Sequence, residues 1–374
     1  MARAVGLLTG GGDCPGLNAV IWAVVRAANR DGIEVFGIED GFEGLIAGGT
    51  VRKLHPDDIR GIIGNGGTVL GTSNRGNPFR YRVEQPDGSA VESDCSDDVV
   101  RAVQLLGLDG LVVIGGDGSL AIAHELSKKG VRIIGVPKTI DNDLSATDNT
   151  FGFYTAVTTA MEALDKLKTT AESHDRVMIL EVMGRDAGWI ALGSGLAAGA
   201  HAILVPEIPY TVEAVLDRIA ARWVEERRNY TLIVVAEGAF PGGSSKSYIE
   251  AAGVGTVARL GGAGHLLQYA LESSFADGWE RNRGKPEIRT TVLGHLQRGG
   301  SPCAYDRIIS VRFGAHAVEL IKADQWDRMV ALQGINIGSV PLSDAIGHQH
   351  FVDPSGQLVA AARSVGICLG DRWP

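Results

Sequence analysis

Cysteine is scarce in this sequence. Only four of 374 residues are cysteine, and they lack metal-ligand spacing: Cys14, Cys95, Cys303 and Cys368. This scarcity excludes a disulfide-stapled scaffold, and we expect reduced thiols in a cytoplasmic protein. The sequence also lacks an apolar run long enough to span a bilayer and a signal-peptide pattern at Met1, so we expect no membrane association.

Positive charge is also in deficit. The chain has 35 Lys and Arg against 44 Asp and Glu, a formal net charge of −9. This balance argues against nucleic acid or a membrane surface as the main partner. It leaves room for a phosphorylated substrate, because a local cluster of Arg and Lys binds phosphate whatever the total charge.

Glycine is abundant, with 51 residues that gather where apolar runs end. Strand-like and helix-like segments alternate almost throughout, which predicts parallel sheets with right-handed crossovers. Expected strands are 4–9, 34–38, 111–114, 133–136, 177–182, 202–205, 231–236 and 288–293. Expected helices are 16–30, 154–168, 212–228 and 305–321.

The alternation predicts an α/β protein of two doubly wound, Rossmann-like lobes with mostly parallel sheets and a cleft between them. The expected boundary lies near residue 150, giving one lobe at 1–150 and a second at 151–374. Part of 275–325 is expected to return to the first lobe. The polar stretch 74–98 predicts a surface hairpin or loop, and the tail beyond residue 335 carries no recognisable chemistry.

Two short segments carry the strongest chemical signal. Gly115–Ser119 (GGDGS) and Pro137–Asp143 (PKTIDND) each follow or end a buried parallel strand. The first offers small residues that let the backbone approach phosphate, and a carboxylate suited to Mg²⁺. The second places carboxylates and a hydroxyl where open α/β sheets bind ligands. Together they indicate phosphoryl transfer to a substrate hydroxyl, although a solvated strand-end turn or an Asp N-cap at Asp143 would explain each segment alone.

Four further features belong to the same hypothesis. The glycine-rich turn 10–16 between the first strand and helix could face an anion, or be a tight turn without a ligand. Arg185 follows a strand within a glycine-flanked loop, and His295 stands near Arg298 and Arg289, which favours a phosphate group. Glu237 at a strand end could accept a hydrogen bond from a sugar hydroxyl, or be simply solvated.

The joint order of these segments resembles the 6-phosphofructokinase family, in its bacterial type and its mixed-substrate ATP/pyrophosphate group. The similarity runs from Ala4 to about Leu320. It consists of GGGDCPGLNA, IGGDGS, PKTIDND, TFGFYTA, SHDRV, EVMGRDAGW, VPE, LGHLQRGGSP and YDR, in family order and spacing. Each piece alone is weak, but the set is very specific.

The resemblance implies transfer of a phosphoryl group from a donor to the 1-hydroxyl of fructose 6-phosphate, a step of glycolysis. By position, Asp141 resembles the general base and Asp117 the residue that binds Mg²⁺. The other implied catalytic residues are Thr139, Gly11 as a backbone donor to the transferred phosphoryl group, and Arg185.

The implied binding residues fall into two sets. Those for the phosphoryl donor are Gly11, Phe42, Arg75, Asp117, Gly118, Ser119 and Lys138. Those for the sugar phosphate are Thr139, Asp141, Asp143, Arg176, Met183, Gly184, Arg185, Glu237, Arg289, His295 and Arg298. Arg176 and Arg289 match arginines that the family contributes from a neighbouring subunit, which implies a homotetramer or homodimer.

The resemblance implies ATP or pyrophosphate as the phosphoryl donor. Family members restricted to pyrophosphate usually carry Asp where this chain has Gly118, and a carboxylate there would repel a nucleotide phosphate. Lys138 argues for pyrophosphate, because typical ATP enzymes have glycine there, and Ile122 is bulkier than the residue expected near adenosine. We favour ATP because steric exclusion is harder to evade than an extra charge.

Two other readings compete. NAD kinases and lipid kinases also use GGDG, but they have no MGR or HLQRGG segment. A non-catalytic sugar-phosphate-binding subunit should have lost Asp141, Asp117 or Arg185, and all three are present. Trp22 and His201 replace an arginine and an acidic residue of regulated relatives, so we expect no nucleoside-diphosphate activation.

Overall fold

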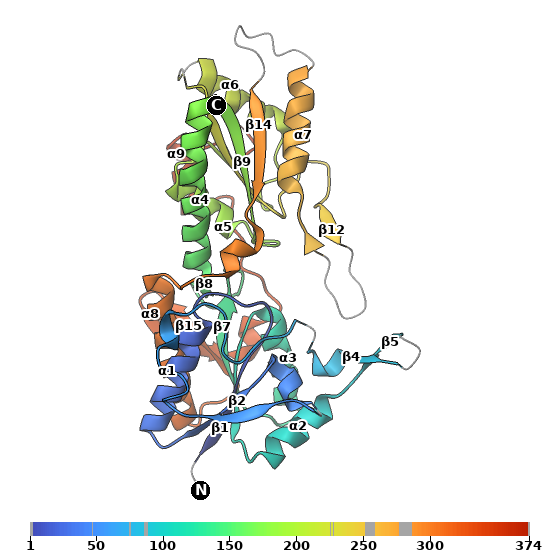
Figure 1. Cartoon of the computed structure of the whole chain (residues 1–374), viewed down its shortest axis with the longest axis vertical. Coiled ribbons are helices and arrows are strands. Elements are labelled where there is room, and N and C mark those ends of the chain that lie inside the picture. The colour runs from blue at the N-terminus through green and yellow to red at the C-terminus, as the bar shows by residue number, and fades with distance from the viewer. Residues whose placement is uncertain are drawn as a thin grey trace. The chain divides into compact units, whose positions relative to one another are not determined.

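A computed structural model describes residues 3–46, 48–74, 76–85, 89–224, 226, 228–250, 259–276 and 286–372. These residues form two compact units (Figure 1). The first contains 3–155 and 298–349, and the second contains 156–250, 259–297 and 350–372. The chain leaves the first unit after Thr155, within helix α4, is again part of it from Arg298, and leaves it once more at His350.

The first unit is built on a sheet of order β16-β15-β7-β6-β1-β2-β3, with β8 paired to β7. Pairs among β1, β2, β6, β7 and β8 are parallel, as is β15 with β7. The strands are β1 (Ala4–Thr9), β2 (Glu34–Ile38), β3 (Val51–Leu54), β6 (Gly110–Gly115), β7 (Ile133–Thr139), β8 (Phe151–Gly152), β15 (Arg328–Gln333) and β16 (Asn336–Pro341). The helices are α1 (Leu17–Arg30), α2 (Ser96–Leu105), α3 (Asp117–Lys128) and α8 (Ala304–Lys322).

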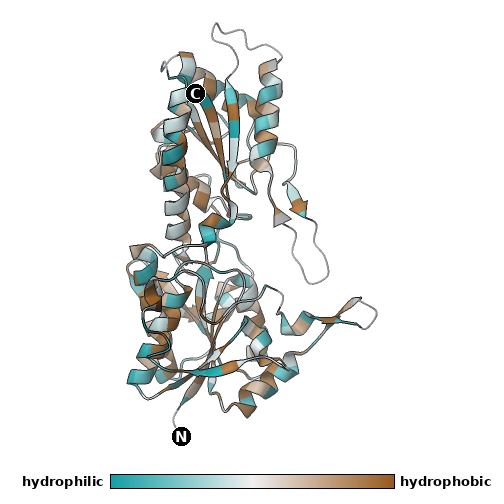
Figure 2. Ribbon diagram, in the orientation of Figure 1, coloured by the Kyte–Doolittle hydropathy of each residue, from teal (hydrophilic) through white to brown (hydrophobic). Residues whose placement is uncertain are grey.

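The central strands of this sheet are apolar because both of their faces are covered. Every residue of β1, β6 and β7 is buried, which is the pattern of a parallel strand between helix layers. The apolar side of α3 joins the same core through Leu120, Ala123 and Leu126 (Figure 2).

The second unit has a four-stranded parallel sheet of order β10-β11-β9-β14 within the described residues. Its strands are β9 (Arg176–Val182), β10 (Ala202–Leu204), β11 (Thr231–Ala236) and β14 (Glu287–Val292). Its helices are α4 (Phe153–His174), which starts in the first unit, α5 (Trp189–Ala197), α6 (Val212–Val224), α7 (Ala263–Ala276) and α9 (Gln357–Ser364). A short antiparallel pair, β12 (Tyr248–Glu250) and β13 (Arg259–Leu260), completes it.

The predicted α/β class with mostly parallel sheets is confirmed. The expected hairpin within 74–98 is present as β4 (Tyr81–Glu84) and β5 (Ala90–Ser93), which pair antiparallel. The helix expected over 212–228 ends at Val224. Glu226 lies beyond that end and accepts hydrogen bonds from both Arg218 and Arg222, so its side chain turns back onto the helix. No helix of the described residues has the length and apolarity that a bilayer span requires.

His201, next to β10, carries a testable effect of pH on stability. Its Nδ1 accepts the Leu232 N–H at 2.8 Å. Burial, with Arg222 and Arg218 nearby, lowers the pKa of His201 from 6.5 to about 3. The unfolded chain therefore binds a proton that the folded chain refuses between those values. Stability is complete above pH 6.5 and falls as the pH drops below it.

We expect His201→Asn to weaken this acid sensitivity. Asparagine keeps an acceptor for the Leu232 N–H but does not titrate. At most, the histidine contributes a slope of about 1.4 kcal/mol per pH unit below its unfolded pKa. Urea unfolding between pH 7.5 and 5 measures the slope, with exposed His55→Asn as the control. Equal slopes in the wild type and His201→Asn would refute the assignment.

Candidate active site

Three neighbouring parallel strands of the first unit, β7, β6 and β1, end at one edge of the sheet (Figure 1). The glycine turn follows β1, the GGDGS segment ends β6, and the PKTIDND segment runs out of β7. The structure therefore brings together the three segments that the sequence singled out. This is the edge where open α/β sheets bind ligands.

The first glycine turn is packed closely by the other two segments. A Cβ on Gly10 would lie 2.7 Å from the Ser119 Oγ. One on Gly11, whose φ is +78°, would lie 3.4 Å from the Lys138 Nζ and 3.5 Å from the same Oγ. Glycine is required here because a side chain would both strain the backbone and fill the space beside Lys138.

Lys138 presents a buried ammonium to this turn. The residue is 5% exposed, and within the described ranges its ammonium makes no hydrogen bond or ion pair. Burial lowers the pKa of Lys138, against the opposing influence of Cys14. Burial likewise raises the pKa of the Cys14 thiol to about 12. A cation held out of water is costly unless an anion arrives, so the geometry suits a phosphate.

The segment after β7 is fixed by its own hydrogen bonds. The Asp141 N–H donates to the Thr139 Oγ1 at 3.1 Å. Asn142 has a left-handed backbone with φ of 53°, and its Oδ1 accepts the Thr150 N–H at 2.9 Å. The Thr150 hydroxyl donates to the Thr139 carbonyl at 2.8 Å. These bonds hold the buried Asp141 carboxyl at a defined place beside the strand end.

Asp117 opens α3 at the same edge. One of its oxygens, Oδ1, accepts the Gly347 N–H at 3.0 Å. In the part of the chain that is described, no group of three or more His, Cys, Asp or Glu side chains could hold a metal. Asp117 nevertheless fits Mg²⁺, because this ion is commonly bound by one or two carboxylates together with substrate phosphates and water.

Three other predicted residues have different settings. Phe42 is 3% exposed and belongs to the core, which leaves little of its ring for a ligand. Arg75 lies outside the described residues. Arg298, which the resemblance groups with His295, belongs to the first unit. Its Nη1 donates to the Asp13 carbonyl at 3.1 Å, beside the glycine turn.

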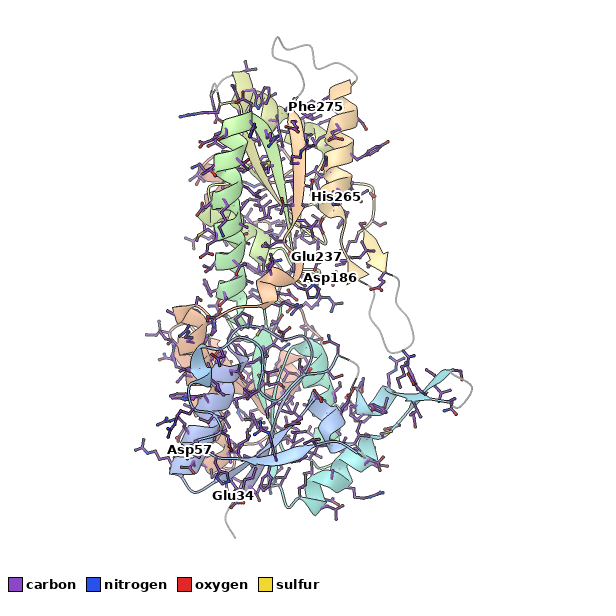
Figure 3. All side chains as sticks on the ribbon, in the orientation of Figure 1. Glu34, Asp57, Asp186, Glu237, His265 and Phe275 are labelled. Carbon is purple, nitrogen blue, oxygen red and sulfur yellow. The ribbon has the colours of Figure 1, made fainter. Side chains whose placement is uncertain are left out.

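A second set of predicted residues gathers in the second unit, where β9, β11 and β14 end at one edge of their sheet. Met183, Gly184 and Arg185 follow β9. Glu237 follows β11, and its Oε1 accepts the Arg185 N–H at 3.0 Å. Figure 3 labels Glu237 together with Asp186, the next residue of this loop. His295 follows β14 and is exposed.

The backbone of this loop is strained in a way that Glu237 supports. Arg185 has φ of 51° and Gly184 has φ of 141°. A Cβ on Gly238 would lie 2.1 Å from the Arg185 carbonyl oxygen, so the backbone segments at these two residues are in direct contact. A non-glycine residue with positive φ persists where its surroundings fix it, and such positions cluster at functional sites.

Arg176 and Arg289 do not join this set within one chain. Arg176 is the first residue of β9, about 20 Å from the far end of the strand at an ordinary rise per residue. Arg289 is paired with Met178, near the same end. Both arginines bind Glu287. They therefore lie toward the edge of the sheet opposite Met183 and His295.

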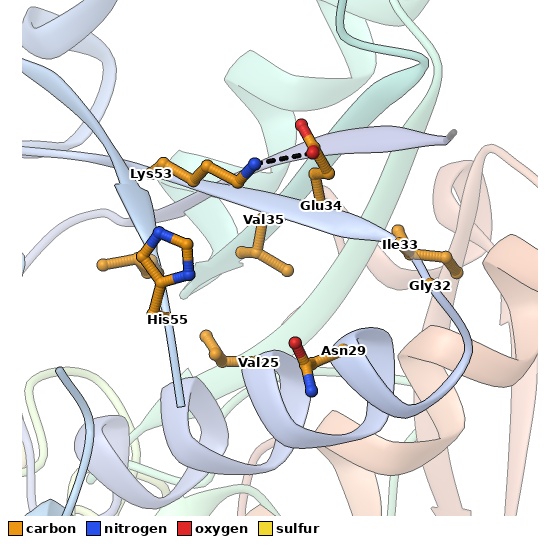
Figure 4. Close-up of a pocket in the computed structure, with 9 residues that line it drawn as sticks. Val25, Asn29, Gly32, Ile33, Glu34, Val35, Lys53 and His55 are labelled. Atoms are coloured by element: carbon orange, nitrogen blue, oxygen red, sulfur yellow. Dashed lines mark hydrogen bonds and ion pairs between the residues drawn. The ribbon is translucent and has the colours of Figure 1, made fainter. Parts of the chain in front are cut away.

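A pocket between α1 and the β2–β3 hairpin contains none of the predicted residues (Figure 4). Its two charged side chains, Lys53 and Glu34, form an ion pair at 2.6 Å. Since these charges satisfy each other, the pocket offers no free cation for a phosphate.

Sequence reasoning missed residues that fix the backbone of the site but take no part in proton or phosphoryl transfer. Asn142 and Thr150 lock the segment after β7, and Asn is among the residues that tolerate a left-handed backbone. The signal was therefore present in the Asp–Asn–Asp run. Glu207 is the last residue of the VPE segment, and the sequence pattern alone assigns it no role.

Comparison with known proteins agrees with this geometry. The phosphofructokinase family model matches residues 4–321. Two curated relatives are 50% identical: the ATP-dependent 6-phosphofructokinase of Chloroflexus aurantiacus, over 99% of this chain and 98% of that protein, and ATP-dependent 6-phosphofructokinase 2 of Clostridium perfringens, over 99% of each. Phosphofructokinase from Saccharomyces cerevisiae has a similar structure, with a TM-score of 0.74 and 30% identity over 92% of this chain and 45% of that one. The chain belongs to the phosphofructokinase family.

Proposed function

We propose that this protein is an ATP-dependent 6-phosphofructokinase. It transfers the γ-phosphoryl group of ATP to the 1-hydroxyl of fructose 6-phosphate and yields fructose 1,6-bisphosphate. The observation that carries the proposal is 50% identity, over 99% of the chain, to relatives of that name. A cytoplasmic location is part of the proposal, and the four free cysteines support it.

The donor phosphates bind at the first unit in this proposal. The backbone of Gly11, the Ser119 hydroxyl and the Lys138 ammonium surround one space at the glycine turn. These groups neutralise and orient phosphate oxygens, which is most of what a kinase has to do. Mg²⁺, held by Asp117 and the donor phosphates, would supply further neutralisation of the charge that develops on transfer.

Asp141 is the proposed general base. It accepts the proton of the 1-hydroxyl as that oxygen attacks the γ-phosphorus, and the ADP oxygen leaves on the opposite side. Thr139 supports it through the hydrogen bond from the Asp141 N–H. Asp143, further along the same segment, is proposed to contact the sugar.

The sugar phosphate binds through the second set in this proposal. One wall of the proposed sugar-phosphate site is formed by Met183, Gly184 and Arg185. Glu237 accepts hydrogen bonds from the sugar hydroxyls. His295 and Arg298 contribute to phosphate binding, for which imidazolium and guanidinium groups are suited.

ATP is the proposed donor rather than pyrophosphate. A Cβ placed on Gly118 would meet no atom within 4 Å, which leaves room for a nucleotide beside the start of α3. Lys138 favours the alternative, a pyrophosphate-dependent phosphotransferase, because its buried charge could replace contacts that adenosine otherwise provides.

A coupled assay with fructose 6-phosphate, Mg²⁺ and each of ATP, ADP and pyrophosphate tests the function and the donor together. Turnover with ATP alone is the expected result. Turnover with pyrophosphate alone would replace the proposed donor, and activity with none would refute the proposed substrate.

A homo-oligomer, either a dimer or a tetramer, is part of the proposal. In one chain, Arg176 and Arg289 lie toward the sheet edge away from Met183 and His295. A second copy could present both arginines to the sugar-phosphate set. Their present shared partner, Glu287, keeps the pair together.

We expect Arg289→Ala to raise the KM for fructose 6-phosphate at least tenfold, by about the worth of one charged hydrogen bond. Mixing it with the base-deficient variant Asp141→Asn, followed by dissociation and reassociation, should restore activity, because each hybrid site can combine an intact base with an intact arginine. Exposed Arg60→Ala is the control. Raised KM without restoration would show that Arg289 acts within its own chain.

A further inference from the structure

Glu207, just after β10, holds two backbone segments with a single carboxylate oxygen. Its Oε1 accepts the Gly188 N–H at 2.9 Å and the Val352 N–H at 2.8 Å. Its Oε2 is buried and has no hydrogen-bond partner within the described residues. Burial raises the pKa of Glu207, while the backbone N–H bonds act to lower it.

One of these segments is the loop 183–188, here called the acceptor loop. Its Arg185 N–H is held by Glu237, and its last residue, Gly188, is held by Glu207. Gly188 has no room for a side chain, because a Cβ would lie 2.4 Å from the Cβ of Val205. Two glutamates that follow neighbouring strands, β11 and β10, therefore fasten the loop at its middle and at its last residue.

The other segment is the chain from 350 to 370, which lies beyond the family match at 4–321. The Trp189 Nε1–H donates to the His350 carbonyl at 2.8 Å, and the two rings are 4.8 Å apart. Further along, Cys368 forms a parallel bridge with Ala202, and the Thr211 N–H donates to the Gly370 carbonyl at 2.7 Å. This segment is thus an integral part of the second unit.

We propose that Glu207 is a positioning residue for fructose 6-phosphate, acting by coupling the acceptor loop to the C-terminal segment 350–370. The inference rests on the proposed function. Arg185 keeps its positive φ only while its surroundings fix the loop. Without an acceptor at Glu207, two buried N–H groups lose their partner and the loop end is released.

Three variants separate positioning from charge and from general damage. Glu207→Ala removes the acceptor. Glu207→Gln keeps an Oε1 that accepts both N–H groups but removes the charge. Asp371→Asn weakens the ion pair at 2.7 Å between Arg363 of the C-terminal segment and Asp371, the residue that follows this segment, without touching Glu207.

Steady-state kinetics and hydrogen exchange read out the effect in the full chain. For Glu207→Ala we expect the KM for fructose 6-phosphate to rise at least about tenfold, because two buried N–H groups lose their partner. We expect an unchanged KM for ATP and faster amide exchange confined to 184–188 and 350–353. Glu207→Gln and Asp371→Asn should resemble the wild type in all three readouts.

Other results would overturn the proposal. Unchanged kinetics and exchange in Glu207→Ala would mean that the carboxylate fixes nothing. Equal losses for both substrates with exchange raised throughout the unit would mean a merely structural role. Glu207→Gln behaving like Glu207→Ala would assign the effect to charge. A wild type without fructose 6-phosphate turnover would instead refute the proposed function, while the exchange pattern would still decide whether Glu207 holds both segments.

Discussion

Replacing Asp141 by asparagine is expected to lower kcat about 1,000-fold, within the range that a general base contributes, while the KM for fructose 6-phosphate changes little. The amide has the size of the carboxyl group but cannot take the proton of the 1-hydroxyl. An interaction that operates only in the transition state affects kcat rather than substrate binding. Steady-state kinetics with saturating ATP measure both constants.

The hydrogen bonds around Asp141 indicate that this substitution leaves the fold of the segment unchanged. The segment is fixed by the Asp141 N–H to Thr139 and by Asn142 to Thr150. Both bonds use groups that the asparagine variant keeps. We therefore expect its thermal unfolding to match that of the wild type within a few degrees.

Asp148→Asn is the matched control. This carboxylate lies seven residues further along the chain, and its Oδ2 accepts the Gly334 N–H at 2.6 Å. The Asp148→Asn variant should have a kcat and KM values for both substrates near those of the wild type. A variant of Asp141 with wild-type kcat would remove it as the base.

The sequence predicts the four described strands of the second sheet and the central strands β1, β6 and β7 of the first. It misses β3 and β16 at the edges of the first sheet, and β15 beside β16. Residues 4–9, 111–114 and 133–136 are continuous apolar runs because helices cover both faces, and such runs are easy to recognise. β3 and β16 have mostly half-buried or exposed residues. Both pair antiparallel, with β2 and β15 respectively. Their periodicity is weak, so the alternation rule passed over them.

The site divides in the same way. Residues that follow a buried strand, such as Gly11, Asp117 and Arg185, can be predicted from the sequence. The apolar run shows where the strand ends, and ligands bind at the carboxyl ends of parallel strands. The meeting of Arg298 with Asp13 joins positions 285 residues apart, and no local pattern encodes that contact. Glu207 was missed for a related reason. Its partner Val352 lies in a segment whose sequence carries no recognisable chemistry, so only the fold reveals the pairing.

Replacing Gly118 by aspartate is expected to lower kcat/KM for ATP at least about 100-fold, since placing like charges together costs several kcal/mol. In the folded chain, a Cβ at this position has nothing within 4 Å, so the new carboxylate would occupy the space proposed for the nucleotide. Kinetics with varied ATP measure the loss, and retained ATP turnover would refute the steric argument for ATP.

Unfolding cannot account for that loss. Gly118 is the second residue of α3, where a carboxylate interacts favourably with the helix dipole, and glycine is the weaker helix former. Gly118→Asp should therefore unfold no earlier than the wild type. Gly118→Ala separates size from charge: a methyl group fits the open space, so it should keep most ATP turnover. If Gly118→Ala lowers ATP turnover as much as Gly118→Asp does, the size of the side chain rather than charge repulsion excludes the nucleotide. If pyrophosphate turnover survives in both variants, the substitutions prevent binding of adenosine rather than of phosphate.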